Sequence, residues 1–215
     1  MNVNKKVAAS LGTALLTAAA IAGSVAASST RSFSANVNGN KLQCFSGTGD
    51  NPEIYGGDCS FDGNVAVIVT TDHGADGSYG GVFIQNSNLG GKLLADVNKL
   101  AFSYDGAGAA GGSPRLSIPI DNNNDGKWDA FAFVDTQGCN DGDVNKGTLD
   151  VINDATCTVS YNNTQYDNWA AFEQANPSLR IAKDAVTFVI VDQPGSFKIS
   201  NVQLGKGPAK PAQGQ

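Results

Sequence analysis

Short apolar or alternating stretches recur along the chain, and each is bounded by Gly, Asn, Asp or Pro. Runs of about four to eight residues with a period of two are typical of half-buried β-strands. Their spacing predicts an all-β fold, a two-sheet β-sandwich with a jelly-roll-like strand order. The predicted strands lie at residues 32–37, 41–45, 65–71, 81–85, 99–104, 115–120, 130–134, 156–161, 186–191 and 196–204.

Two of these strands have further features. The strand at 186–191 is apolar at nearly every position, so we expect it to be central and covered on both faces. The strand at 115–120 contains Pro119, which has no backbone N–H to donate, so we expect an edge strand or a bulge there.

One window predicts a short helix, near residues 168–175. It contains good helix formers, and either Asp167 or Asn168 can cap its N-terminus. It stops before Asn176, because the residue preceding Pro177 is disfavoured in a helix.

The two ends of the chain differ from the rest. Residues 1–27 contain two lysines, an apolar run and a small-residue end, the pattern of a secretory signal peptide, with an uncleaved membrane anchor as the alternative. Residues 205–215 have no apolar side chain larger than Ala, which predicts a flexible tail. We therefore expect a single β-sandwich domain at 28–204, secreted and without a membrane span in the mature chain.

Charge limits the classes of partner. The 215 residues include 20 acidic and 14 basic side chains, a net charge of −6. Removal of the signal peptide would leave 12 basic and 20 acidic side chains, a net charge of −8. Because nucleic-acid binding depends on Lys and Arg neutralising phosphates, nucleic acid is not expected as a partner.

All four cysteines follow the signal peptide, and an even number in an exported chain favours disulfides. We favour the pairs Cys44–Cys59 and Cys139–Cys157 among the three arrangements, because each encloses a short segment rich in Gly, Asp and Asn. Free buried thiols are the alternative. Zinc is disfavoured, because the chain has no C-x-x-C spacing and its single histidine, His73, is distant in sequence.

The clearest candidate chemistry lies at residues 121–129, where oxygen-bearing side chains alternate around a glycine. This spacing is typical of a tight loop that wraps oxygen ligands around Ca²⁺. It is not an EF-hand, since Ala132 stands where the bidentate Glu is required. A long hairpin loop built of turn-forming residues is the alternative. The predicted ligands are the side chains of Asp121, Asn123, Asp125 and Asp129 and the carbonyl of Lys127, with Gly126 at the turn.

Catalytic motifs are scarce. A Ser-His-Asp or Cys-His arrangement would have to use His73, and no G-x-S-x-G motif accompanies it. Glycoside hydrolysis needs two carboxyl groups, a pair that 18 aspartates leave open. We therefore expect a protein without enzymatic activity, with a glycan-active enzyme as the alternative.

Four aromatic residues are candidates for sugar stacking: Trp128, Tyr161, Tyr166 and Trp169. Packing against the protein is the alternative for each. It is favoured for Trp169, which lies three residues before Phe172 on the predicted helix and would attach the helix to a sheet.

Three segments carry a resemblance to known proteins: residues 112–118, the loop at 121–129 with the strand 130–134, and residues 186–192 with 195–202. The stretch that they span, residues 79–204, resembles a group of secreted, mainly bacterial β-sandwich proteins, similar in outline to jelly-roll carbohydrate-binding modules. The resemblance implies the fold and export, and glycan binding by analogy alone. No catalytic residue is carried over from it.

Together these patterns predict a secreted binding module for extracellular polysaccharide or a surface glycan, with a structural calcium loop. One alternative is a structural cell-surface or matrix protein without enzymatic activity. The other is a sandwich-fold polysaccharide hydrolase or lyase.

Overall fold

The fold was obtained as a computed structural model, which describes residues 34–48, 58–70, 78–85, 87–107, 112–139, 143 and 145–205. The predicted signal peptide at 1–27 and all but the first residue of the predicted tail lie outside these residues. In chain order the elements are β1 (Ser34–Val37), β2 (Asn40–Thr48), β3 (Asp58–Asp62), β4 (Val65–Thr70), β5 (Ser78–Gln85), the 3₁₀ turn η3 (Leu94–Asp96), β6 (Leu100–Ala107), β7 (Arg115–Asp121), β8 (Ala130–Asp135), β9 (Lys146–Asp150), β10 (Val159–Tyr161), β11 (Thr164–Tyr166), α2 (Trp169–Ala175), β12 (Arg180–Ile181), β13 (Thr187–Val191) and β14 (Gly195–Leu204).

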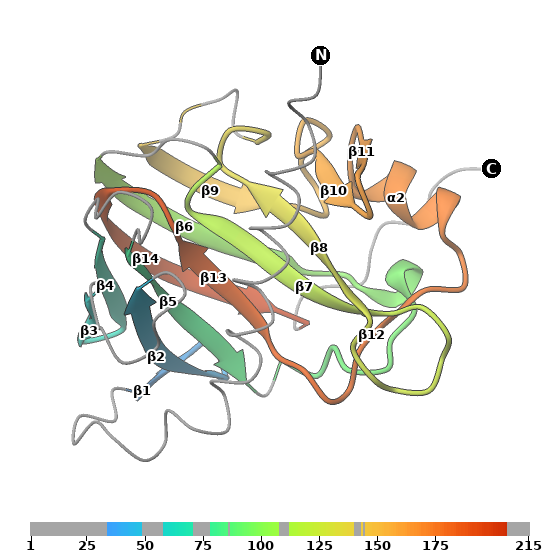
Figure 1. Cartoon of the computed structure of the whole chain (residues 1–215), viewed down its shortest axis with the longest axis horizontal. Helices are drawn as coiled ribbons and strands as arrows, with labels where there is room; N and C mark the ends of the chain where they lie inside the picture. The colour runs from blue at the N-terminus through green and yellow to red at the C-terminus, as the bar shows by residue number, and fades with distance from the viewer. Residues whose placement is uncertain are drawn as a thin grey trace.

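The strands form two antiparallel sheets, which lie as two layers in Figure 1. The larger sheet has the order β1-β2-β5-β13-β7-β8-β10-β11, with β12 paired to β7. The smaller sheet has the order β3-β4-β14-β6-β9. The chain repeatedly passes from one sheet to the other, as from β4 to β5, β5 to β6 and β13 to β14. The predicted all-β, two-sheet sandwich is confirmed.

Alternating residues of the two sheets meet in the core. In β4, Ala66 and Ile68 are fully buried while Val69 on the other face is exposed. Leu116 and Ile118 of β7 are also fully buried and belong to the same core cluster. Burial of each Leu or Ile side chain contributes about 1.5–3 kcal/mol, so this layer holds the sheets together.

The predicted helix is present as α2, and Figure 1 shows it beside β10 and β11. Its N-cap is Asn168, whose side-chain oxygen accepts a hydrogen bond from the Ala171 N–H at 2.9 Å. Trp169 and Phe172 are buried. The ring centroids of Tyr161 and Phe172 lie 5.3 Å apart, so the helix is attached to β10 by aromatic packing.

Both predicted disulfides are confirmed. Cys44–Cys59 joins β2 of the larger sheet to β3 of the smaller one, with 5.5 Å between the Cα atoms. Cys139–Cys157 joins the segment after β8 to the segment before β10. Two disulfides in one chain are typical of a protein outside the reducing cytoplasm. Within the described ranges, no helix has the length and apolar character needed to cross a membrane.

The expectation that Pro119 marks an edge or a bulged strand is wrong, because β7 lies between β13 and β8. Its pairing with β13 ends at Ser117, and the pairing with β12 begins at Ile120. Pro119 therefore lies between two partners of β7. Its carbonyl accepts a hydrogen bond from Ala182 N at 3.0 Å, and the missing N–H falls where no strand requires a donor.

Candidate functional site

The loop from β7 to β8 is organised around the side chain of Asp121, which is 1% exposed. Its Oδ1 accepts hydrogen bonds from the N–H groups of Asn123 at 3.2 Å and Asn124 at 2.7 Å. Its Oδ2 accepts one from Gly126 N at 2.8 Å. Gly126 has a φ of 87°, a conformation that favours glycine. The loop is therefore wrapped around one buried carboxylate.

The other predicted ligands also bond within the loop. The Asp125 Oδ1 accepts from Lys127 N at 2.8 Å, and the Asn123 Oδ1 accepts from Asp125 N at 2.9 Å. The Asp129 Oδ2 accepts from Asn122 N at 2.7 Å. Such contacts are the turn chemistry of Asn and Asp. No group of three or more His, Cys, Asp or Glu suited to a metal occurs among the residues that the structure describes.

Two other parts of the chain hold this loop in place. The Arg180 Nε donates to Asn124 Oδ1 at 2.9 Å, and the backbone N–H of Trp128 donates to Asp184 Oδ1 at 2.8 Å. From β10, the Tyr161 hydroxyl donates to Asn122 Oδ1. Burial raises the pKa of Tyr161 above its ordinary value of 10.0. These contacts fix the position of Trp128 at the end of the loop.

Trp128 lies at the border of an aromatic layer on the outer face of the larger sheet, opposite the core. Because side chains alternate along a strand, the residues between the core positions of β2, β5, β13 and β8 point to this face. We name this layer the aromatic face. It consists of the buried rings of Phe45, Phe131 and Phe188 and the partly buried Tyr79, Phe83, Trp128, Phe133 and Ile190.

The rings of the aromatic face form a continuous series. Phe45 stacks on Phe83 with 4.3 Å between ring centroids and meets Phe188 edge-on at 5.9 Å. Phe188 meets Phe131 edge-on at 5.2 Å, and Phe131 lies 4.8 Å from Trp128. The series therefore runs from β2 across the sheet to the Asp121 loop. This second layer covers the outer face of β13, as predicted from its apolar sequence.

Two glycines make room for rings of this face. A Cβ on Gly81 would lie 2.4 Å from the Phe45 Cζ, and one on Gly47 would lie 2.6 Å from the Tyr79 Cζ. Both distances are shorter than carbon–carbon contact allows. The glycines of β2 and β5 thus allow the rings to lie flat against the sheet.

Three buried polar atoms of this layer have no hydrogen-bond partner among the residues that the structure describes: Ser117 Oγ, Arg115 Nε and Trp128 Nε1. Ser117 of β7 is the cross-strand neighbour of Phe133 and Phe188. The Arg115 guanidinium carbon lies 5.0 Å from the Phe133 ring centroid, and its Nη2 donates to Asp192 Oδ2 at 2.6 Å. Donors without a partner among the described residues therefore lie beside the rings of the aromatic face.

The four predicted stacking residues separate in the structure. Trp128 lies on the aromatic face, half-buried. Trp169 is 1% exposed and Tyr161 is 6% exposed, so their rings are used in packing and are not offered to a ligand. Tyr166 packs on Phe172, with 5.2 Å between centroids. Trp169 and Tyr161 therefore pack against the protein.

Sequence reasoning did not single out the phenylalanines of the aromatic face. The signal was present as apolar residues at successive positions, as in Ala130–Phe131–Ala132–Phe133 of β8. A strand with one solvated face would alternate apolar and polar residues instead. Such a run indicates two covered faces, and it does not say what covers the second.

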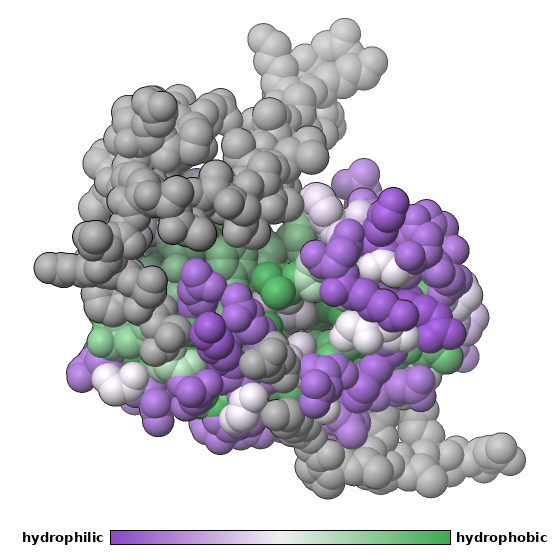
Figure 2. All heavy atoms as spheres, turned by 90° about the horizontal axis from the view of Figure 1, so that it is seen from below, coloured by the Kyte–Doolittle hydropathy of each residue, from purple (hydrophilic) through white to green (hydrophobic). Residues whose placement is uncertain are grey.

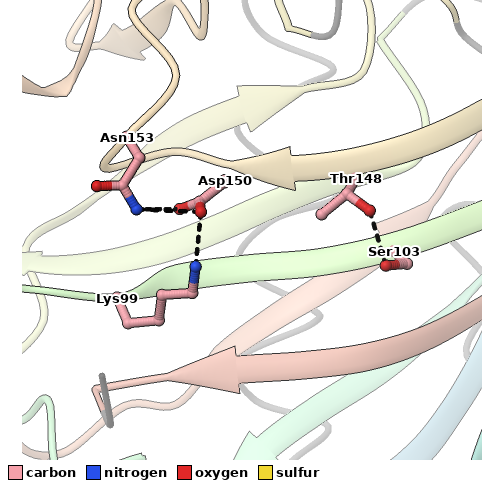
Figure 3. Close-up of polar contacts among 5 residues, drawn as sticks. All are labelled: Lys99, Ser103, Thr148, Asp150 and Asn153. Atoms are coloured by element: carbon pink, nitrogen blue, oxygen red, sulfur yellow. Dashed lines mark hydrogen bonds and ion pairs between the residues drawn. The ribbon is translucent and has the colours of Figure 1, made fainter. Parts of the chain in front are cut away.

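The outer face of the smaller sheet is different in character. Figure 3 shows Lys99 Nζ donating to Asp150 Oδ2 at 2.6 Å, with Asn153 bonded to the same carboxylate. Further along, on the paired strands β6 and β9, the Ser103 and Thr148 hydroxyls lie 2.8 Å apart. This face is polar, so the two outer faces of the sandwich are chemically distinct.

Figure 2 shows the molecule from below, with hydrophobic residues beside hydrophilic ones on this side of the surface. Comparison of the chain with protein-family models, curated proteins and solved structures found no match.

Proposed function

We propose that this protein is an exported module that binds extracellular polysaccharide on its aromatic face. The observation that carries the proposal is the group of partly buried rings that lies on the buried Phe45, Phe131 and Phe188, namely Tyr79, Phe83, Trp128 and Phe133. Beside them, the indole Nε1–H of Trp128 and the Nε–H of Arg115 have no hydrogen-bond partner among the residues that the structure describes. Ligand sites combine an apolar, aromatic lining with a few polar groups that fix orientation.

A sugar ring matches this combination. Its C–H groups form an apolar face that packs on an aromatic ring, and its hydroxyls lie at the edge, where they accept and donate hydrogen bonds. Rings on neighbouring strands of one sheet are about 5 Å apart, so a series of them forms an extended platform. Such a platform suits consecutive residues of a polymer better than an isolated small molecule.

Charge narrows the class of polysaccharide. The Arg115 guanidinium is paired with Asp192 at 2.6 Å, so its charge is already compensated. The mature chain would carry a net charge of −8, which repels anionic polymers at moderate ionic strength. A neutral or amino-substituted polysaccharide is therefore the proposed ligand.

Calcium enters the proposal as a structural ion of the loop at 121–129, which presents Trp128 to the aromatic face. The carboxylates of Asp121, Asp125 and Asp129 supply hard oxygen ligands, and each carboxylate retains acceptor capacity beyond its loop hydrogen bonds. The ion would fix the loop, and the sugar would contact the rings. Export rests on the predicted signal peptide and on the two disulfides.

The test is binding of the mature chain, residues 28–215, to a panel of neutral, amino and acidic polysaccharides, with calcium and with chelator. We expect Trp128→Ala and Phe83→Ala to weaken binding about tenfold or more, the loss typical of a central aromatic contact. Val69→Ala is the matched control, because Val69 is a 39%-exposed apolar residue on the smaller sheet.

Three outcomes would contradict the proposal. Binding that is unchanged in both aromatic variants would remove the aromatic face from recognition. Self-association without affinity for any polysaccharide would favour the structural cell-surface or matrix protein. Release of new sugar ends during incubation would instead indicate the hydrolase or lyase.

A further inference from the structure

A polar cavity of about 510 Å³ lies at the end of β8, next to the Cys139–Cys157 disulfide. Its lining includes one carboxylate, two amides and two hydroxyls, from Asp135, Gln137, Gln165, Thr156 and Thr158. A cavity of this size accommodates a small ligand or one unit of a larger one.

The cavity adjoins the aromatic face. Phe131, Phe133 and Asp135 are alternate residues of β8, so their side chains point to the same face of the sheet. β8 pairs with β7 along one edge and with β10 along the other, where Ser160 lies opposite Phe133. The next strand, β11, places Gln165 opposite Ser160. A polymer that lies over Phe133 would therefore reach the cavity.

No ion pair involves the carboxylate of Asp135 among the residues that the structure describes. Its Oδ1 accepts a hydrogen bond from Gly138 N at 2.7 Å, while its Oδ2 has no hydrogen-bond partner among the described residues. Its cross-strand neighbour Arg115 is paired with Asp192 instead. No Lys, Arg or His belongs to the described lining of the cavity.

We infer that this cavity binds the ammonium group of an amino sugar, with Asp135 as its acceptor; the inference rests on the proposed function, since the sugar belongs to the polysaccharide on the aromatic face. An ammonium supplies three donors and the positive charge that the carboxylate lacks. The amides of Gln137 and Gln165 and the Thr158 hydroxyl match the hydroxyls of the same sugar. The Thr156 hydroxyl donates to Asp154 Oδ1 at 2.7 Å, so it is left as an acceptor. A uronate in this position would place two carboxylates together.

The experiment compares three β-linked hexasaccharides of the same linkage, which carry an amine, an acetamide or a hydroxyl at carbon 2. Each is titrated into the mature chain at a mildly acidic pH, where the amine is protonated. We expect the amine to bind about tenfold more tightly than the other two, the effect of one charge-assisted hydrogen bond. In Asp135→Asn the amine is expected to lose this preference, while the hydroxyl form binds as before.

Asp167→Asn is the matched control, because Asp167 is exposed and does not line the cavity. If Asp167→Asn reduces the preference as much as Asp135→Asn, the preference arises from net charge and the inference is wrong. Equal binding of the three oligosaccharides would also overturn it, while leaving the proposed function in place. If none of them binds and the polysaccharide panel is negative too, both fail. Unchanged thermal unfolding of Asp135→Asn shows that the variant is folded.

Discussion

Replacement of Asp121 by Ala measures how far one carboxylate holds the loop between β7 and β8. The variant removes the acceptor of three backbone N–H groups, at 2.7, 2.8 and 3.2 Å. A hydrogen bond to a charged group contributes about 1.5–3 kcal/mol. In the variant the loop amides regain hydrogen bonds to water, and one of the three lost bonds is long. We therefore expect the free energy of unfolding to fall by about 2–4 kcal/mol in total.

Asp125→Ala provides the comparison within the same loop. Asp125 is exposed and its Oδ1 accepts a single hydrogen bond, from Lys127 N at 2.8 Å, so its loss is expected to cost about 0.5–1 kcal/mol. For a domain of this size 1 kcal/mol corresponds to roughly 2–4 °C in Tm. In the presence of chelator, the Tm should therefore fall by roughly 5–15 °C in Asp121→Ala and by a few degrees at most in Asp125→Ala.

The same two variants test the calcium proposal. Calcium is expected to raise the Tm of the wild-type chain, because an ion that binds only the folded state stabilises it, and Asp125→Ala is expected to abolish that rise. An equal loss of stability in Asp121→Ala and Asp125→Ala in chelator would refute the role given to Asp121. A wild-type melt that is identical with calcium and with chelator would refute the ion.

Two further predictions concern stability. Burial raises the pKa of Tyr161 in the folded state, so the unfolded chain loses this proton first; stability should fall as the pH rises above 10.0, and the fall should be smaller in Tyr161→Phe, as measured by denaturant unfolding across that range. Replacing Cys44 and Cys59 together by Ser opens a loop with a sequence separation of 15 and is expected to lower the free energy of unfolding by about 3 kcal/mol. A double variant as stable as the disulfide-bonded wild type would contradict this.

The sequence predicted the elements that carry several apolar residues in a regular pattern. It missed β9, because Lys146–Asp150 has the single buried apolar residue Leu149 and reads as part of an acidic loop. It also missed β3, β11 and β12, which have at most five residues each and are positioned by neighbouring strands. The strand predicted at 156–161 begins only at Val159, after the buried Cys157.

The candidate site was predictable in part. The spacing of Asp and Asn around Gly126 indicated a tight loop, and the structure has it wrapped around Asp121. The aromatic face could not be derived, because it depends on which strands are neighbours. Phe45, Phe188 and Phe131 are far apart in the chain and meet because β2, β13 and β8 lie in one sheet.

The Cys44–Cys59 bond has a mechanical consequence. It joins β2, inside the larger sheet, to β3, at the edge of the smaller one. A pulling force that began to peel β1 and β2 from the larger sheet would be transmitted through the sulfur atoms to β3. The load would then be shared by the hydrogen bonds between β3 and β4 as well as those between β2 and β5. Under shear at a surface, the N-terminal edge of the sandwich would resist unravelling as a two-sheet unit.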